Sequence, residues 1–275
     1  MSETAHPTPG HAPAHDEEEE MHHHLSPWPV VSALGATVLL VGLVLHPLVL
    51  FLGVILTFAG LAGWVREDMH FYRHPAPELY HSGTAPNPFW GVILFLGTEV
   101  VLFGALFAAY FTGRGAAQAD DPSSWPGVHL PFTATLINTI ILVSSGATMH
   151  WAMHSIQHDK RRNFLIGLVL TLILGGIFLA QQVREYIELI TKEGLTLGEN
   201  PHGSGLFGSV FYGLTGTHGL HVFGGLIAIF IVFVRAMKGQ FNKDKYLLVE
   251  GAAFYWHFVD VVWIFLFIVI YGGWI

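Results

Sequence analysis

The stretch EGAAFYWHFVDVVWIFLFIVIYGGWI, residues 250–275, decides the fold class of this chain. It is predominantly apolar over a length that suits a helix crossing ~30 Å of hydrocarbon, which takes about 20 residues. Two polar residues, His257 and Asp260, nevertheless lie well inside it. Polar groups at membrane depth almost always face the interior of a helix bundle and find partners there. The stretch therefore predicts the last helix of a membrane-embedded bundle.

The composition of the whole chain agrees with this prediction. Of the 275 residues, 52% are hydrophobic and 12% are charged, about half of the charged fraction of an ordinary soluble domain. The net charge of -8 does not indicate an acidic binding face, because residues 16–20 alone supply five of the twenty acidic side chains. The chain has no cysteine, so a metal site would need histidine and carboxylate ligands.

Hydropathy divides the chain into a polar tail and seven apolar spans. We expect residues 1–25, which contain no lysine or arginine, to form a disordered tail. A helical hairpin is predicted for residues 26–65, a loop on the inner side for residues 66–88, and five further helices for residues 89–275. The predicted spans are residues 30–45, 47–64, 89–112, 131–157, 163–183, 205–234 and 252–275.

The distribution of basic residues predicts the orientation of these spans. If the chain has seven spans and its N-terminus lies inside, nine of the twelve lysines and arginines fall in loops on the inner side. Only Arg114, Arg184 and Lys192 fall on the outer side. An excess of positive charge marks the cytoplasmic side. We therefore expect a cytoplasmic N-terminus and a C-terminus outside the cell membrane.

Several ionisable side chains are predicted to lie at membrane depth. At 1.5 Å per helical residue, Glu99 lies ~15 Å and His221 ~21 Å from the inner side, so they share roughly one level. His218 lies one turn further out. For Glu99, a proton relay, a lipid-headgroup contact and a structural hydrogen bond are all open interpretations. Asp260 and His257 lie ~10 to 15 Å from the inner face.

Histidine spacing leaves a second question open. His218 and His221 are three residues apart, and His150 and His154 are four apart, so each pair places two imidazoles on one helix face. Such pairs could ligate a metal or haem, but hydrogen bonds between helices are the simpler interpretation. The glycines of GLHVFGGL form no nucleotide-binding loop, because no strand precedes them. We expect no nucleic-acid partner.

Six motifs in order resemble the cytochrome c oxidase subunit III family. They are SPWP (residues 26–29), ILFLGTEVVLFGALF (93–107), LINTIILVSSGATMHWAMHS (136–155), QQVREY (181–186), FGSVFYGLTGTHGLHVFGGL (207–226) and YWHFVDVVWIFLF (255–267). The resemblance covers all seven spans. It implies an all-α integral membrane fold of seven transmembrane helices, in which the first two splay from a five-helix bundle and leave a V-shaped cleft that holds phospholipid.

The resemblance also implies a function. The chain would be an accessory core subunit of a proton-pumping terminal oxidase that reduces O2 to water, in the plasma membrane of the cell. It would carry no haem, copper or other metal, because those cofactors belong to its partners, oxidase subunits I and II. Cytochrome c would meet the complex rather than this chain. The alternatives are subunit III of a quinol oxidase and an independent proton or ion transporter, although the chain shows no internal repeat.

Particular residues inherit roles from the family pattern. Glu99 matches the membrane carboxylate, His218 and His221 match the histidines of helix six, and Arg235 matches the lipid-headgroup arginine. His257 and Asp260 take the polar positions of the last helix, with His150 as a partner at similar depth. We expect Glu99 to be hydrogen-bonded to helix six.

The sequence departs from the family pattern after helix two. Family members often have paired tryptophans there, whereas this chain has Trp64 followed by Val65. Trp64, Arg66 and His70 are the predicted lipid contacts in this region, on the inner side where anionic lipid is attracted.

Overall fold

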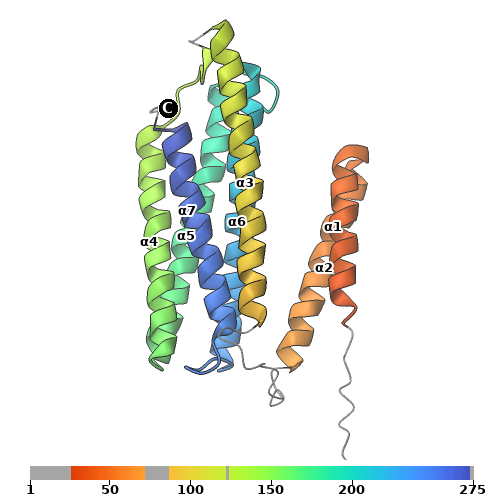
Figure 1. The fold of residues 1–275 in the computed structure, drawn as a ribbon, viewed down its shortest axis with the longest axis vertical. Helices are drawn as coiled ribbons and strands as arrows, with labels where there is room; N and C mark the ends of the chain where they lie inside the picture. The colour runs from red at the N-terminus through yellow and green to blue at the C-terminus, as the bar shows by residue number, and fades with distance from the viewer. Residues whose placement is uncertain (1–25, 72–86, 122–123, 273–275) are drawn as a thin grey trace, which may run out of the picture. The chain divides into compact units, whose positions relative to one another are not determined.

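The computed structural model describes residues 26–71, 87–121 and 124–272, and its regular elements there are all α-helices. The helices are α1 (Trp28–Leu45), α2 (Pro47–Phe71), α3 (Asn87–Asp120), α4 (Phe132–Gln157), α5 (Arg161–Lys192), α6 (Gly205–Met237) and α7 (Leu247–Ile270). They belong to two compact units, one with α1 and α2 and the other with α3 to α7 (Figure 1). The predicted tail, residues 1–25, lies outside the described residues.

The lengths and apolar composition of the helices confirm a multi-pass membrane protein. Helices α2 to α7 each contain a segment long and apolar enough to cross a membrane, and α1 contributes a shorter apolar segment, Trp28–Leu39. Helix α5 continues to Lys192 instead of ending at residue 183 as predicted. Glu188 pairs with Arg184 and Lys192, one turn away on either side, so ion pairs sustain the helix beyond its apolar part.

Helices α1 and α2 form the predicted hairpin. His46 ends α1 in an extended conformation, and its Nδ1 accepts a hydrogen bond of 3.1 Å from the Leu48 N–H. Pro47 suits the first position of α2, where its missing N–H has no helical partner. Gly35 lets the two backbones approach, because a Cβ there would lie 2.8 Å from the Thr57 Cα. Small residues permit this close packing in membranes.

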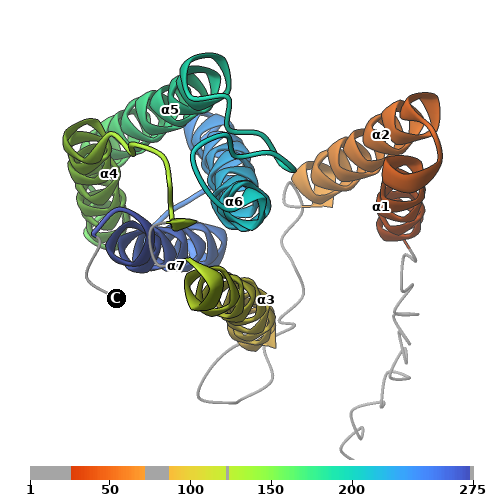
Figure 2. The same ribbon diagram turned by 90° about the horizontal axis from the view of Figure 1, so that it is seen from above.

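The second unit is a five-helix bundle. Helices α4, α5, α6 and α7 form a closed ring in which each helix contacts two neighbours, and α3 packs against α6 and α7. Figure 2 shows this ring from above, with α3 lying outside it. The five-helix bundle was predicted from the family resemblance, whereas the lipid cleft depends on how the two units are placed and stays a prediction.

One side chain of α7 links all four helices of the ring. Trp256 is fully buried, and its Nε1–H donates a 3.0 Å hydrogen bond to the Ser145 hydroxyl on α4. The benzo edge of its indole faces Gly175 on α5 and Gly225 on α6, where an added Cβ would lie 2.8 Å from the ring. These two glycines make room for the bulky indole of Trp256 in the core.

Candidate functional site

A carboxylate and an imidazole meet between α3 and α6. Oε2 of Glu99 lies 2.8 Å from Nε2 of His221, and the two side chains are only 14% and 15% exposed. His221 is the central residue of α6, sixteen residues from Gly205 and sixteen from Met237. The expected bond from Glu99 to helix six is present, and it lies near the middle of the span.

The hydrogen bonds define how many protons this pair holds. Nδ1 of His221 lies 2.8 Å from the Thr217 carbonyl, which can only accept, so Nδ1 carries a hydrogen. The contact with Glu99 then needs one further proton, either on the carboxyl group or on Nε2. In both cases the pair is neutral overall. It can pass that proton between oxygen and nitrogen without burying a net charge.

Aromatic side chains limit access to the pair. The Phe103 ring packs edge-on against the His221 ring at a centroid distance of 5.0 Å, and Phe103 is buried. The Tyr255 ring of α7 stacks on the His221 ring at a centroid distance of 6.4 Å, and its hydroxyl donates to the His221 carbonyl at 3.1 Å. Contacts from α3, α6 and α7 therefore hold the imidazole in one orientation.

His218 has different surroundings from its neighbour. It is fully buried inside the ring of helices and stacks on Trp263 at a centroid distance of 5.0 Å. Among the described residues, neither of its ring nitrogens has a hydrogen-bond partner. The structure therefore separates the two histidines, since His221 bonds to α3 and His218 packs in the core. Among residues 26–71, 87–121 and 124–272, which the structure describes, no group of three or more His, Cys, Asp or Glu side chains could hold a metal ion.

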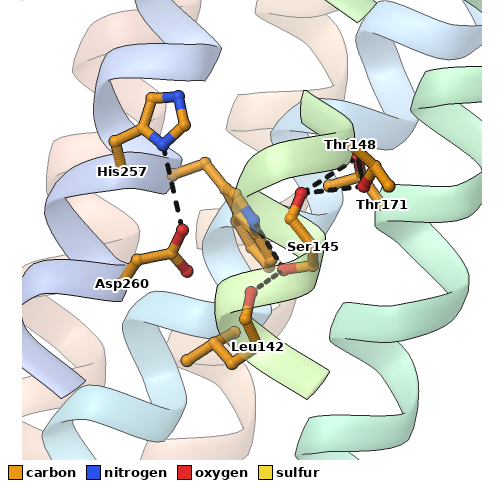
Figure 3. Close-up of polar contacts among 7 residues, drawn as sticks. Leu142, Ser145, Thr148, Thr171, His257 and Asp260 are labelled. Atoms are coloured by element: carbon orange, nitrogen blue, oxygen red, sulfur yellow. Dashed lines mark hydrogen bonds and ion pairs between the residues drawn. The ribbon is translucent and has the colours of Figure 1, made fainter. Parts of the chain in front are cut away.

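The polar residues of the last helix lie against α4. Asp260 is 7% exposed, and its Oδ2 lies 3.8 Å from Nδ1 of His257, beyond hydrogen-bonding distance. Figure 3 shows these two side chains on α7, beside the bonded residues Ser145, Thr148 and Thr171 of α4 and α5. The carboxylate packs directly over Gly146, where any Cβ would collide with it.

His150 joins this group, as its depth predicted. Its ring centroid lies 6.2 Å from that of His257, so α4 and α7 bring the two imidazoles together. The described residues contain no hydrogen bond between them. The two histidines therefore lie close together as predicted, and they meet through a contact between their rings instead of a hydrogen bond.

The predicted lipid contacts fall in both units. Arg235 is buried at the end of α6, where its Nε–H donates to Gln240 at 2.9 Å and its guanidinium lies 5.6 Å from the centre of the Phe241 ring. Trp64 and Arg66 are exposed on α2. His70 belongs to the same helix, but its side chain is outside the described part. Lipid binding by these residues stays a prediction.

A second buried carboxylate was not predicted. Glu185 on α5 is 8% exposed, and it accepts a 2.6 Å hydrogen bond from the Tyr271 hydroxyl while the Thr135 hydroxyl lies 3.2 Å from its other oxygen. Burial and the Glu185 carboxylate raise the pKa of Tyr271 well above its usual value, so Tyr271 stays a donor.

A periodic signal for Glu185 exists in the sequence. The buried face of α5 repeats at Phe178, Gln182, Glu185 and Leu189, which is the spacing of one helix face. The predicted span ended at residue 183, so this carboxylate was placed outside the membrane. The helical spacing of these buried positions continues past residue 183, so it predicts that Glu185 belongs to the buried face of α5.

Comparisons with known proteins place the chain in one family. Residues 21–274 match the family described as "Cytochrome c oxidase subunit III". The chain is 36% identical over 258 residues to "Cytochrome c oxidase subunit 3" of Mammuthus primigenius, covering 90% of this chain and 94% of that protein. The proteins of the same name from Heterololigo bleekeri and Drosophila melanogaster are both 35% identical, over 90% of this chain and 94% and 95% of their own lengths.

Proposed function

Because the chain belongs to the cytochrome c oxidase subunit III family, we propose that it is a subunit without redox centres in a proton-pumping haem–copper oxidase. The complex reduces O2 to water with electrons from cytochrome c, and subunits I and II hold the haem and copper. This chain stabilises subunit I and its phospholipid, and it supports proton uptake from the inner side of the plasma membrane. Its N-terminus is cytoplasmic and its C-terminus lies outside.

The Glu99 and His221 pair is the observation that carries this proposal. A carboxyl group at membrane depth is costly unless it is neutral or paired, and here the imidazole supplies the partner. The 2.8 Å contact between Oε2 and Nε2 needs one proton, and both side chains are slightly exposed. The pair can therefore take part in proton exchange near the catalytic subunit without being a catalytic group of the oxidase itself.

Phospholipid binding is the second part of the proposal. A guanidinium matches the geometry of a phosphate group. That of Arg66 is exposed on α2, and that of Arg235 is buried at the end of α6 beside Gln240. Trp64 is exposed on the same helix as Arg66, and aromatic rings of this kind anchor at the membrane interface. A phospholipid headgroup bound at Trp64 and Arg66, or a separate one bound at Arg235, would stabilise the association of this chain with its partner.

The role of Glu99 can be tested in the purified complex with two substitutions. Glu99→Gln keeps a hydrogen bond to His221 but removes the exchangeable carboxyl proton, whereas Glu99→Ala removes both. We expect both variants to keep most of the initial oxidase rate, and Glu99→Ala to lose activity faster over many turnovers because the subunit and its lipid are held less firmly. If Glu99→Gln abolishes the initial rate, Glu99 is an obligatory proton carrier and the accessory role is wrong.

The partners and the electron donor need a separate measurement. Native mass spectrometry of the complex would identify the subunits and retained lipids that accompany this chain. Parallel assays with reduced cytochrome c and with a quinol would identify the donor. A chain that purifies alone and moves protons in vesicles would instead be a transporter, and the proposal would fail.

A further inference from the structure

Two imidazoles on the outer surface of α4 and α7 lack hydrogen bonds. Several polar side chains of the bundle form hydrogen bonds across helix contacts, as Trp256 does with Ser145. The rings of His150 and His257 contact each other but form no hydrogen bond within the described residues. His150 is exposed, and the His257 side chain is 39% exposed. The exposed parts of both rings face outward from the bundle, while Nδ1 of His257 points toward the Asp260 carboxylate on its own helix (Figure 3).

His257 lies too deep to be reached by water at the membrane surface, and His150 is nearer to that surface. His257 follows Leu247, the first residue of α7, by ten residues, which is ~15 Å along the helix. His150 precedes Gln157, the last residue of α4, by seven residues, or ~10 Å. Helix α7 is ~36 Å long and the hydrocarbon layer is ~30 Å, so only about 3 Å projects at each end. His257 thus lies within the hydrocarbon layer.

Lipid tails cannot satisfy these groups. A polar group buried in an apolar medium without a hydrogen bond costs free energy, and ionisable residues in membrane spans face protein or water. Exposed apolar side chains surround them on this face, Val143 on α4 and Val261 and Ile264 on α7. The exposed His154 lies one turn from His150, toward the end of α4. An apolar surface with a polar centre is the kind of face that packs against another transmembrane helix.

Asp260 adds an acceptor beneath this face. Its Oδ1 is buried without a hydrogen bond among the described residues. Its Oδ2 lies 3.8 Å from Nδ1 of His257, within ion-pair range (Figure 3) but too far for a hydrogen bond. Gly146 provides the space that the carboxylate occupies. A donor that bonded to Nε2 of His257 from outside would leave the ring hydrogen on Nδ1, which faces the Asp260 carboxylate.

We infer that the face of α4 and α7 centred on His257, with His150 and Asp260 beside it, is the contact surface for another transmembrane subunit of the oxidase. The partner helix brings a hydrogen-bonding side chain, a donor such as a hydroxyl, amide or imidazole, to the depth of His257. This inference rests on the proposed function, because it needs a complex in which such a subunit exists. It adds which face of the bundle is covered and what chemistry covers it.

A photo-crosslinking residue at Val261 tests the surface in the intact complex. Val261 is 64% exposed on α7 beside Asp260, and Ile173 on α5 is a matched control that is 52% exposed on another helix. A benzophenone at position 261 should join this chain to another subunit several-fold more efficiently than one at position 173. Equal yields at the two positions, or adducts only with lipid or with a second copy of this chain, would overturn the inference.

Substitutions of His257 test the chemistry of the contact. His257→Leu should weaken retention of this chain during detergent purification by roughly three- to twentyfold, the worth of one such hydrogen bond in a membrane. His257→Gln, which can still hydrogen-bond, should restore much of it. Thr98→Val is the control, because the exposed Thr98 hydroxyl already bonds to the Phe95 carbonyl of its own helix. Retention of His257→Leu at the level of Thr98→Val would refute the inference.

Failure of the inference and failure of the proposed function give different results. If the unmodified chain does not purify with oxidase subunits, the proposed function is wrong and the inference falls with it. If it does purify with them while position 261 gives no more subunit adduct than position 173, only the assignment of this face is wrong. Helix content of each variant, measured by circular dichroism, confirms that the bundle is folded.

Discussion

Two adjacent glycines on α5 provide a quantitative test of the core. A Cβ on Gly175 would lie 2.8 Å from two carbons of the Trp256 ring and from a methyl group of Leu226, whereas a Cβ on Gly176 would meet no atom within 4 Å. Carbon atoms normally approach to about 3.5–4.0 Å. Gly175→Ala must therefore displace Trp256 by about 0.7–1.2 Å, and Gly176→Ala displaces nothing.

The expected difference follows from these contacts. Both substitutions replace glycine by alanine within one helix, so both gain up to about 1 kcal/mol of helix propensity, and this gain cancels in the comparison. Overpacking of a closely packed core costs about 1–3 kcal/mol. Trp256 is fully buried and bonded to Ser145, so it cannot move without cost. We expect Gly175→Ala to be about 1–3 kcal/mol less stable than Gly176→Ala.

Titration of the purified chain with sodium dodecyl sulfate in mixed detergent micelles, followed by circular dichroism, measures this difference. A third variant locates its cause. Trp256→Phe replaces the indole, whose benzo ring meets position 175, by a smaller ring. It should therefore lower the stability of the Gly175→Ala chain less than it lowers the stability of the unmodified chain. The coupling energy between the two substitutions should be about 0.5–3 kcal/mol. Equal stability of Gly175→Ala and Gly176→Ala, or no coupling with Trp256→Phe, would refute the packing argument.

Three further predictions concern other contacts. A double-mutant cycle between Glu99→Leu and His221→Phe should give a coupling of about 0.6–1.7 kcal/mol in bundle stability, and additive effects would show that their 2.8 Å contact contributes nothing. Gly35→Leu should separate α1 from α2, because its side chain would enter the Thr57 backbone, and disulfide trapping between cysteines introduced on the two helices should fall. Arg235→Ala should reduce the phospholipid that is retained in the purified complex, as measured by mass spectrometry of extracted lipid, and unchanged lipid would show that Arg235 does not bind it.

The sequence alone determined the helices and the family. Long apolar segments in a chain with few charges can satisfy their backbone groups in a membrane only as helices, so hydropathy was enough to find the seven helices of the described residues. Six of them are long and apolar enough to cross a membrane. The turn at His46 and Pro47 was also readable, because proline starts a helix well and interrupts a continuing one. Helix ends were less certain, since α5 continues as far as Lys192 on ion pairs that hydropathy does not register.

Only the tertiary structure decided which side chains meet. Depth along the helices placed Glu99 level with His221 and His150 near His257, but depth does not specify the rotation of a helix about its axis. That rotation is fixed by packing around bulky groups such as Trp256, and it turns His218 into the core while His221 reaches α3. It also buries Glu185 against Tyr271. Spacing along one helix limits the partners of a residue, and the packing of several helices selects among them.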